Sequence, residues 1–281
     1  MAIASIAGIE LSYRVAGPEG RTPVVFIHGY TGNLRNWSLQ VKALTARGGF
    51  RCLSADNPGH GDSSAPTDPH AYDLDQVAEV LHQLAVGLDF APAILFGHSM
   101  GGAIAEEYAI RFPNHVRALV LVGSAGGASG PERLAMVEQV ASLRAVHAAA
   151  GGGSAGMGAV YDARLAATPM PAHEALPAQA RAFLRDEFMR THWLGYEHGA
   201  RALHTRAETL TALADFGKPT LLVHGAAESD ALKRVSADLA MTIPGARRVV
   251  IPDAGHSPQF ENAEAFNREM FAFIDALPSA G

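Results

Sequence analysis

The sequence has 281 residues, with 22 lysines and arginines against 28 aspartates and glutamates, so its formal net charge at pH 7 is −6. It contains no block of like charge, which argues against nucleic acid or an anionic membrane surface as a partner. The single cysteine, Cys52, excludes an intramolecular disulfide, and no segment has the pattern of a membrane span or secretory signal, so we expect a cytoplasmic protein.

The first 122 residues alternate between short apolar runs and helical patterns. An edge strand is expected at residues 9–15, followed by buried strands at 23–27, 51–55, 93–96 and 118–122. Helical spacing of apolar residues occurs at 37–46, 74–86 and 100–112. Strands and helices in alternation predict a mainly parallel sheet that is covered by helices on both faces.

After residue 123 this alternation stops. Helical segments follow at 131–150, 178–189 and 191–205, and the glycine-rich residues 151–158 are expected to be a mobile stretch. Strand patterns resume at 220–223 and 248–251, and a last helix is expected at 263–277. The pattern therefore predicts an α/β core formed by residues 1–123 and 217–281, interrupted by a helical cap at 124–216.

Ser99 lies in the segment GHSMG (residues 97–101), between a predicted strand and a predicted helix. A serine on so tight a strand-to-helix turn requires glycine on both sides, because a side chain there would collide with a neighbouring strand or helix. The turn raises the hydroxyl above the sheet and points the first free N–H groups of the helix toward the same space. This arrangement is typical of an acyl-transfer nucleophile.

Three further motifs follow predicted strands: HGYTG at residues 28–32, DNPGHGDS at 56–63 and GHS at 255–257. Ligand sites of open parallel sheets lie at the carboxyl ends of the strands, so these loops are expected to converge on one crevice.

Together, the motifs resemble those of the α/β-hydrolase superfamily, in its compact branch of esterases, lactonases, carbon–carbon hydrolases and haloperoxidase-like perhydrolases. The resemblance implies an α/β-hydrolase fold with a helical cap inserted before the penultimate strand. It also implies that Ser99 is the nucleophile and His256 the general base. The backbone N–H groups of Tyr30 and Met100 would form the oxyanion hole, and no cofactor is implied.

The third member of the triad departs from the family pattern. The usual motif after the penultimate strand is His-Gly-x-x-Asp, whereas this chain has HGAAESD at residues 224–230. Glu228 occupies the register position of the aspartate, and counting on to the turn at 243–245 requires no gap. The register therefore favours Glu228 as the triad acid, with Asp230 as the alternative.

The predicted function is that of a serine hydrolase, which cleaves a carboxylic ester or lactone of a small, largely apolar substrate through an acyl-enzyme. Cleavage of a carbon–carbon bond in a vinylogous diketone is an alternative, although such hydrolases commonly carry Asn at the position of His98. Perhydrolase side activity and a non-turnover small-molecule receptor on the same fold are further alternatives. A homodimer is compatible with the sequence.

Several cap residues are candidates to roof an apolar pocket: Met157, Tyr161, Met170, Phe183, Phe188, Met189 and Trp193. Arg35 and Arg190 are candidate cations for a substrate carboxylate, but no motif places either of them. The cap histidines His192, His198 and His204 recur every six residues, which puts them on different faces of a helix, so we predict no metal site.

Overall fold

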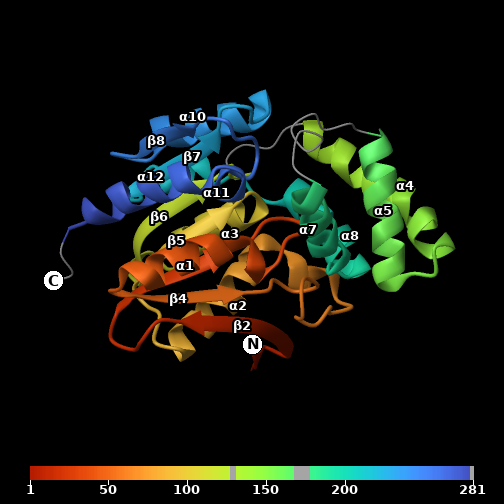
Figure 1. Cartoon of the computed structure of the whole chain (residues 1–281), viewed down its shortest axis with the longest axis horizontal. Helices are drawn as coiled ribbons and strands as arrows, with labels where there is room; N and C mark the ends of the chain where they lie inside the picture. The colour runs from red at the N-terminus through yellow and green to blue at the C-terminus, as the bar shows by residue number, and fades with distance from the viewer. Residues whose placement is uncertain (127–130, 168–177, 279–281) are drawn as a thin grey trace.

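The structure is a computed structural model that describes residues 1–126, 131–167 and 178–278. These residues contain an eight-stranded sheet with the strand order β1-β2-β4-β3-β5-β6-β7-β8 (Figure 1). Strands β3 to β8 are parallel, whereas β1 and β2 are antiparallel at one edge. The bounds are β1 (Ala2–Ile6), β2 (Ile9–Ala16), β3 (Thr22–Ile27), β4 (Phe50–Ala55), β5 (Ala93–His98), β6 (Val116–Val122), β7 (Thr220–Gly225) and β8 (Arg247–Ile251).

Helices cover both faces of the sheet, as the sequence predicted. The helices are α1 (Ser38–Arg47) and α12 (Ala263–Asp275) on one face, and α2 (Leu74–Gly87), α3 (Met100–Arg111) and α10 (Asp230–Thr242) on the other. Alternate side chains of one strand enter opposite cores: Val25 and Ile27 of β3 pack toward α2 and α3, whereas Val24 and Phe26 pack toward α1 and α12. Continuous apolar runs are therefore required in the central strands.

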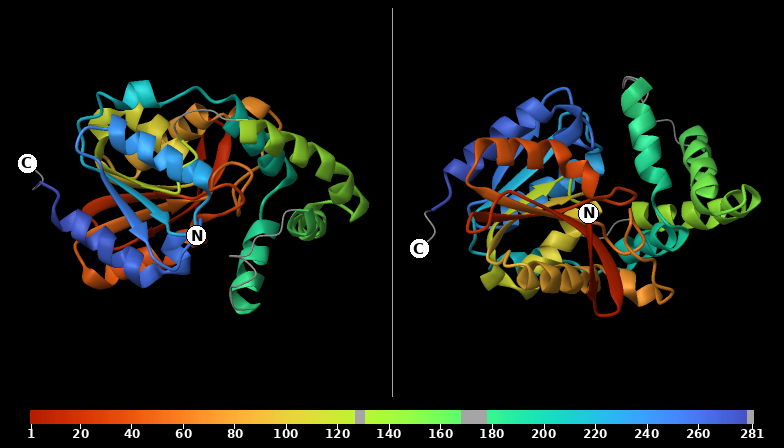
Figure 2. Two further views of the ribbon diagram at one scale, coloured as in Figure 1. Left: turned by 90° about the horizontal axis from the view of Figure 1, so that it is seen from above. Right: turned by 60° about the horizontal axis from the view of Figure 1, so that its bottom comes forward.

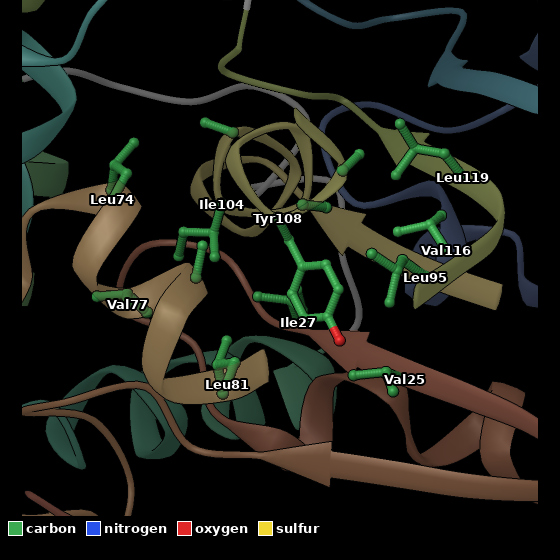
Figure 3. Close-up of a cluster of buried hydrophobic side chains, with 14 of the residues drawn as sticks. Val25, Ile27, Leu74, Val77, Leu81, Leu95, Ile104, Tyr108, Val116 and Leu119 are labelled. Atoms are coloured by element: carbon green, nitrogen blue, oxygen red, sulfur yellow. The ribbon is translucent and has the colours of Figure 1, made fainter. Parts of the chain in front are cut away.

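Figure 3 shows the first of these cores, in which Leu81 of α2 and Tyr108 of α3 lie over Val25 and Leu95 of the sheet. Burial of each such large apolar side chain contributes about 1.5–3 kcal/mol. Together, these contacts fix α3 against β5, the strand that precedes Ser99.

Between β6 and β7, the described residues form helices that lie to one side of the sheet (Figures 1 and 2). These inserted helices are α4 (Pro131–Ala149), α5 (Gly153–Ala167), α7 (Ala178–Met189) and α8 (Trp193–Thr205), and short helix α9 (Leu210–Leu213) leads back to β7. They share an apolar core of their own, which includes Met157, Val160 and Tyr196.

Two local differences from the sequence prediction occur. Residues 153–158 belong to α5, so the expectation of a mobile stretch over 151–158 is wrong for most of it. Strand β1 was not predicted, because it pairs on one side only and exposes its side chains, among them Ile3 with an exposed fraction of 63%.

No helix within the three described ranges combines the length and apolar character needed to cross a membrane.

Candidate active site

Ser99 occupies the turn between β5 and α3 with φ 53° and ψ −117°. Such a conformation costs about 1–3 kcal/mol in a non-glycine residue and persists only where the surroundings enforce it. A Cβ atom on Gly97 would collide with the backbone of Gly101, and one on Gly101 would collide with the Ile27 carbonyl. The requirement for glycine on both sides of the serine is therefore confirmed.

Hydrogen bonds to the end of β6 hold this turn in place. The Ser99 N–H donates to the Val122 carbonyl over 2.9 Å, and the Ser99 carbonyl accepts from the Ala125 N–H over 3.0 Å. The serine is thus fixed between two neighbouring strands, with its hydroxyl at their carboxyl ends.

Three side chains from separate loops form a continuous hydrogen-bonded chain. His256 Nε2 lies 2.9 Å from Ser99 Oγ, and His256 Nδ1 lies 2.7 Å from Glu228 Oε2. The Glu228 side chain is 3% exposed and the His256 side chain 42% exposed. If Glu228 is ionised, it accepts from Nδ1–H and leaves Nε2 as the acceptor that faces the serine hydroxyl.

The surroundings of Glu228 favour its ionised form. Burial alone would raise its pKa, but the hydrogen bond and charge of His256, together with the Ser229 N–H over 2.7 Å, lower the pKa overall. Asp230 instead begins α10 with an 89% exposed side chain, 3.9 Å from Lys233 Nζ. The structure brings Glu228, and not Asp230, to the imidazole.

A second imidazole supports the backbone beneath the first. His98 Nε2 lies 2.9 Å from the His256 carbonyl oxygen, to which it can donate a hydrogen bond. Burial, followed by the nearby charge of His256, lowers the pKa of His98 to about 3, so that this ring stays neutral at ordinary pH. His98 therefore acts as a structural neighbour of the site.

The loop that carries Tyr30 runs directly against Ser99. A Cβ atom on Gly29 would lie 3.1 Å from Ser99 Cβ, and the Gly32 N–H closes the turn on the Gly29 carbonyl over 3.1 Å. Within the described residues, neither the Tyr30 N–H nor the Met100 N–H donates to a protein acceptor. These two amides are available for a ligand beside Ser99.

The Tyr30 side chain links this loop to the inserted helices. Its ring stacks on Tyr196 with centroids 5.3 Å apart, and its hydroxyl donates to the Tyr196 carbonyl over 2.5 Å. Tyr196 lies in α8, so the loop next to Ser99 and the inserted helices are held together at this point.

A cavity of about 460 Å³ opens above Ser99 and His256. The Tyr30 loop lines it, together with apolar side chains from the inserted helices: Tyr161, Leu165, Leu184, Phe188 and Leu203. Tyr161 and Phe188 belong to the roof expected from the sequence, whereas Met170 lies outside the described residues. An apolar, concave site with a few polar groups is the usual form of a small-molecule site.

The charged groups of the cavity were not found by sequence reasoning. Arg164, Glu187 and Glu261 line it. The two arginines singled out in the sequence are instead paired with acidic residues, Arg35 with Glu187 over 3.0 Å and Arg190 with Asp62 over 2.7 Å. Tyr161 precedes Arg164 by three residues, so the two side chains lie on the same face of α5. This helical spacing could have placed Arg164 beside Tyr161 in the sequence analysis. The glycine-rich start of α5 obscured it, because no helix was predicted there.

Among the residues that the structure describes, no group of three or more His, Cys, Asp or Glu side chains is arranged to hold a metal ion. His192 serves as the N-cap of α8, where its Nδ1 accepts from the Leu194 N–H over 3.1 Å.

A family model described as the alpha/beta hydrolase fold matches residues 22–263. The chain belongs to this family. The resemblance and the fold class expected from the sequence are therefore confirmed, including the position of the helical insertion before the penultimate strand.

The relatives of this α/β-hydrolase include several hydrolytic enzymes. A crystal structure of the enol-lactonase from Burkholderia xenovorans LB400 aligns with a TM-score of 0.81 and 28% identity, over 98% of this chain and 100% of that one. The pimeloyl-[acyl-carrier protein] methyl ester esterase of Yersinia enterocolitica is 29% identical over 276 residues, which are 94% of this chain and 97% of that protein.

A third relative is named for a different activity. The dihydrolipoyllysine-residue acetyltransferase component of the acetoin cleaving system from Pseudomonas putida is 34% identical over 275 residues. The match covers 96% of this chain and 68% of that protein. Esterase, lactonase and acyltransferase names thus occur among the relatives of one fold.

Proposed function

We propose that this α/β-hydrolase is a serine hydrolase that cleaves a carboxylic ester or lactone of a small, largely apolar substrate. The observation that carries the proposal is the chain of hydrogen bonds from Ser99 Oγ through His256 to Glu228, at the floor of an apolar cavity. The enol-lactonase and methyl ester esterase among the relatives support the same class of substrate.

In the proposed reaction, Ser99 Oγ attacks the carbonyl carbon while His256 Nε2 accepts the hydroxyl proton. The tetrahedral oxyanion is stabilised by the N–H groups of Tyr30 and Met100, and losing one such donor costs about 3–4 kcal/mol in a studied protease. When the carbon–oxygen bond breaks, His256 returns the proton to the leaving alkoxide, and an acyl-enzyme remains on Ser99.

Water then completes the cycle. His256 accepts a proton from the water that attacks the acyl carbonyl, and gives it back to Ser99 Oγ as the carboxylic acid leaves. Glu228 orients the imidazole and stabilises its protonated form in both halves of the reaction. We also propose that residues 124–216 act as a cap on the core formed by residues 1–123 and 217–281, since helices of this segment supply one wall of the cavity.

The test is turnover of short-chain p-nitrophenyl esters by the wild type, Ser99→Ala and Ser142→Ala. Ser142 is an exposed serine of α4 and serves as the matched control. Rapid turnover by the wild type and Ser142→Ala, with loss in Ser99→Ala, is the expected result. A single acylation without turnover would support a small-molecule receptor instead, and inertness toward esters would direct the test to lactones and diketones.

A second candidate, favoured by the 34% identity to the acetyltransferase component, is transfer of the acyl group to a thiol instead of water. In this case the thiol sulfur attacks the acyl carbonyl while its proton passes to His256. The bond between Ser99 Oγ and the acyl carbon then breaks as His256 gives that proton to Oγ, which leaves a thioester and the free enzyme. Adding dihydrolipoamide to the ester assay distinguishes the two candidates. Accumulation of the thioester in place of free acid supports transfer, and free acid alone supports hydrolysis.

A further inference from the structure

Arg164 is the single guanidinium or ammonium group that lines the cavity in the described part of the chain. It is partly buried, and within those residues no carboxylate lies within ion-pair distance of it. A partly buried guanidinium that lines a cavity and has no acidic partner among the described residues is available to bind an anion.

The other arginines near the site show the usual alternative. Arg35 pairs with Glu187, Arg190 with Asp62 and Arg185 with Asp162 over 2.9 Å. Each of these three arginines is paired with a carboxylate of the protein and is therefore less available to a ligand than Arg164 is. Arg164 differs from them in lining the cavity and in having no acidic partner among the residues that the structure describes.

The two carboxylates that line the same cavity are already engaged. Glu187 is paired with Arg35, and Glu261 accepts from the Ser257 N–H over 2.9 Å. Neither carboxylate pairs with Arg164, which in the described part of the chain remains the cation of the cavity that a ligand can pair with.

The charge of Arg164 also acts on the Tyr30 side chain. Burial raises the pKa of the Tyr30 hydroxyl, and the charge of Arg164 opposes that rise. The neighbours of Arg164 on the cavity face of α5 are Tyr161 and Leu165, one turn before and one residue after it. A ligand that reaches from Ser99 to Arg164 thus passes apolar side chains.

We infer that Arg164 binds a carboxylate of the substrate, so that the preferred esters or lactones carry an anionic group separated from the scissile carbonyl by an apolar spacer. The inference rests on the proposed hydrolase function. A guanidinium binds a carboxylate through two parallel N–H···O bonds, which a neutral amide of the same shape cannot reproduce.

The experiment compares two matched pairs of esters: mono-p-nitrophenyl glutarate with its ω-carboxamide, and 3-acetoxybenzoate with 3-acetoxybenzamide. We expect the wild type to prefer the carboxylate in at least one pair by about tenfold or more in kcat/KM. In Arg164→Gln that ratio falls to about one, and Arg164→Lys retains part of it. Arg190→Gln, which removes a paired arginine, leaves the ratio unchanged.

Equal use of both members in both pairs, or a ratio that survives in Arg164→Gln, overturns the inference while leaving ester hydrolysis intact. If no ester is turned over, the hydrolase proposal fails, and binding then decides the role of Arg164. Calorimetry of monomethyl glutarate with Ser99→Ala measures that binding. The inference predicts that the affinity for monomethyl glutarate is about tenfold or more lower in Ser99→Ala/Arg164→Gln than in Ser99→Ala. An unchanged affinity refutes the inference.

Discussion

Replacing Glu228 by glutamine tests the assignment of the triad acid most directly. The substitution keeps the shape of the side chain but removes its charge at the position 2.7 Å from His256 Nδ1. An amide NH₂ that donates to Nδ1 stabilises the tautomer with its proton on Nε2, and that tautomer cannot accept the Ser99 proton. The variant therefore lacks both the charge and the correct orientation of the general base.

The expected loss follows from the burial of the pair. Opposite unit charges about 4 Å apart interact by about 4 kcal/mol at an effective dielectric constant of about 20. Because the His256 side chain is 42% exposed, we reduce this to about 3 kcal/mol, which agrees with the upper range for a hydrogen bond to a charged group. Since about 1.4 kcal/mol corresponds to tenfold in rate, kcat should fall by roughly 100-fold or more.

The assay is steady-state hydrolysis of the best p-nitrophenyl ester, with Asp230→Asn as the matched control. Asp230 has an exposed carboxylate at the start of α10, and its neutralisation should change kcat by less than about twofold. If Glu228→Gln retained most of its activity while Asp230→Asn lost it, the assignment of Glu228 and the reasoning from register would both be wrong.

Three further changes have defined outcomes. Gly97→Ala should destabilise the protein by about 1–3 kcal/mol in urea unfolding because the methyl group meets the backbone of α3, whereas Gly87→Ala, which meets nothing within 4 Å, should be neutral or stabilising. Burial, and to a lesser extent the charge of His28, lowers the pKa of His60 from 6.5 to about 3, so the unfolded chain takes up a proton between pH 7 and 5 that the folded chain does not. The free energy of unfolding of the wild type should therefore fall by about 2 kcal/mol between pH 7 and 5, whereas that of His60→Asn should not show this fall. The difference in free energy of unfolding between the two proteins should narrow as the pH falls. A difference that stays constant would contradict a neutral buried ring. Tyr30→Phe removes the hydrogen bond to the Tyr196 carbonyl and should lower the free energy of unfolding by about 1 kcal/mol. KM should rise by a larger factor than kcat falls, because the backbone N–H of residue 30 remains. A fall in kcat by a larger factor than the rise in KM would place the hydroxyl itself in the reaction.

The sequence predicted those parts of the site that depend on local backbone requirements. The turn at Ser99 needs glycine at 97 and 101 for steric reasons, and this need is visible in five consecutive residues. Parallel strands place their carboxyl ends at one edge, which is why Gly29 and His256, 70 and 157 residues away from Ser99, could be expected beside it. The structure brings Glu228 to His256 as the register argument favoured, while the catalytic roles of these residues remain predictions.

Long-range packing accounts for what the sequence did not predict. Helix α5 begins with glycines that have low helix propensity, and it is stabilised instead by burial of Met157 and Val160 among the inserted helices. The position of Arg164 in the cavity depends on that packing. Its significance also depends on the pairing of Arg35 with Glu187, which lies 152 residues away in the chain.

The two ends of the helical insertion meet at a single buried carboxylate. Glu106 of α3 is fully buried and accepts hydrogen bonds from Ser124 Oγ over 2.8 Å and from Thr209 Oγ1 over 2.6 Å. Ser124 follows β6 where the chain leaves the sheet, and Thr209 precedes α9 where it returns. Because α3 begins immediately after Ser99, the helix that adjoins Ser99 also binds, through Glu106, residues near both ends of the inserted segment that lines the cavity.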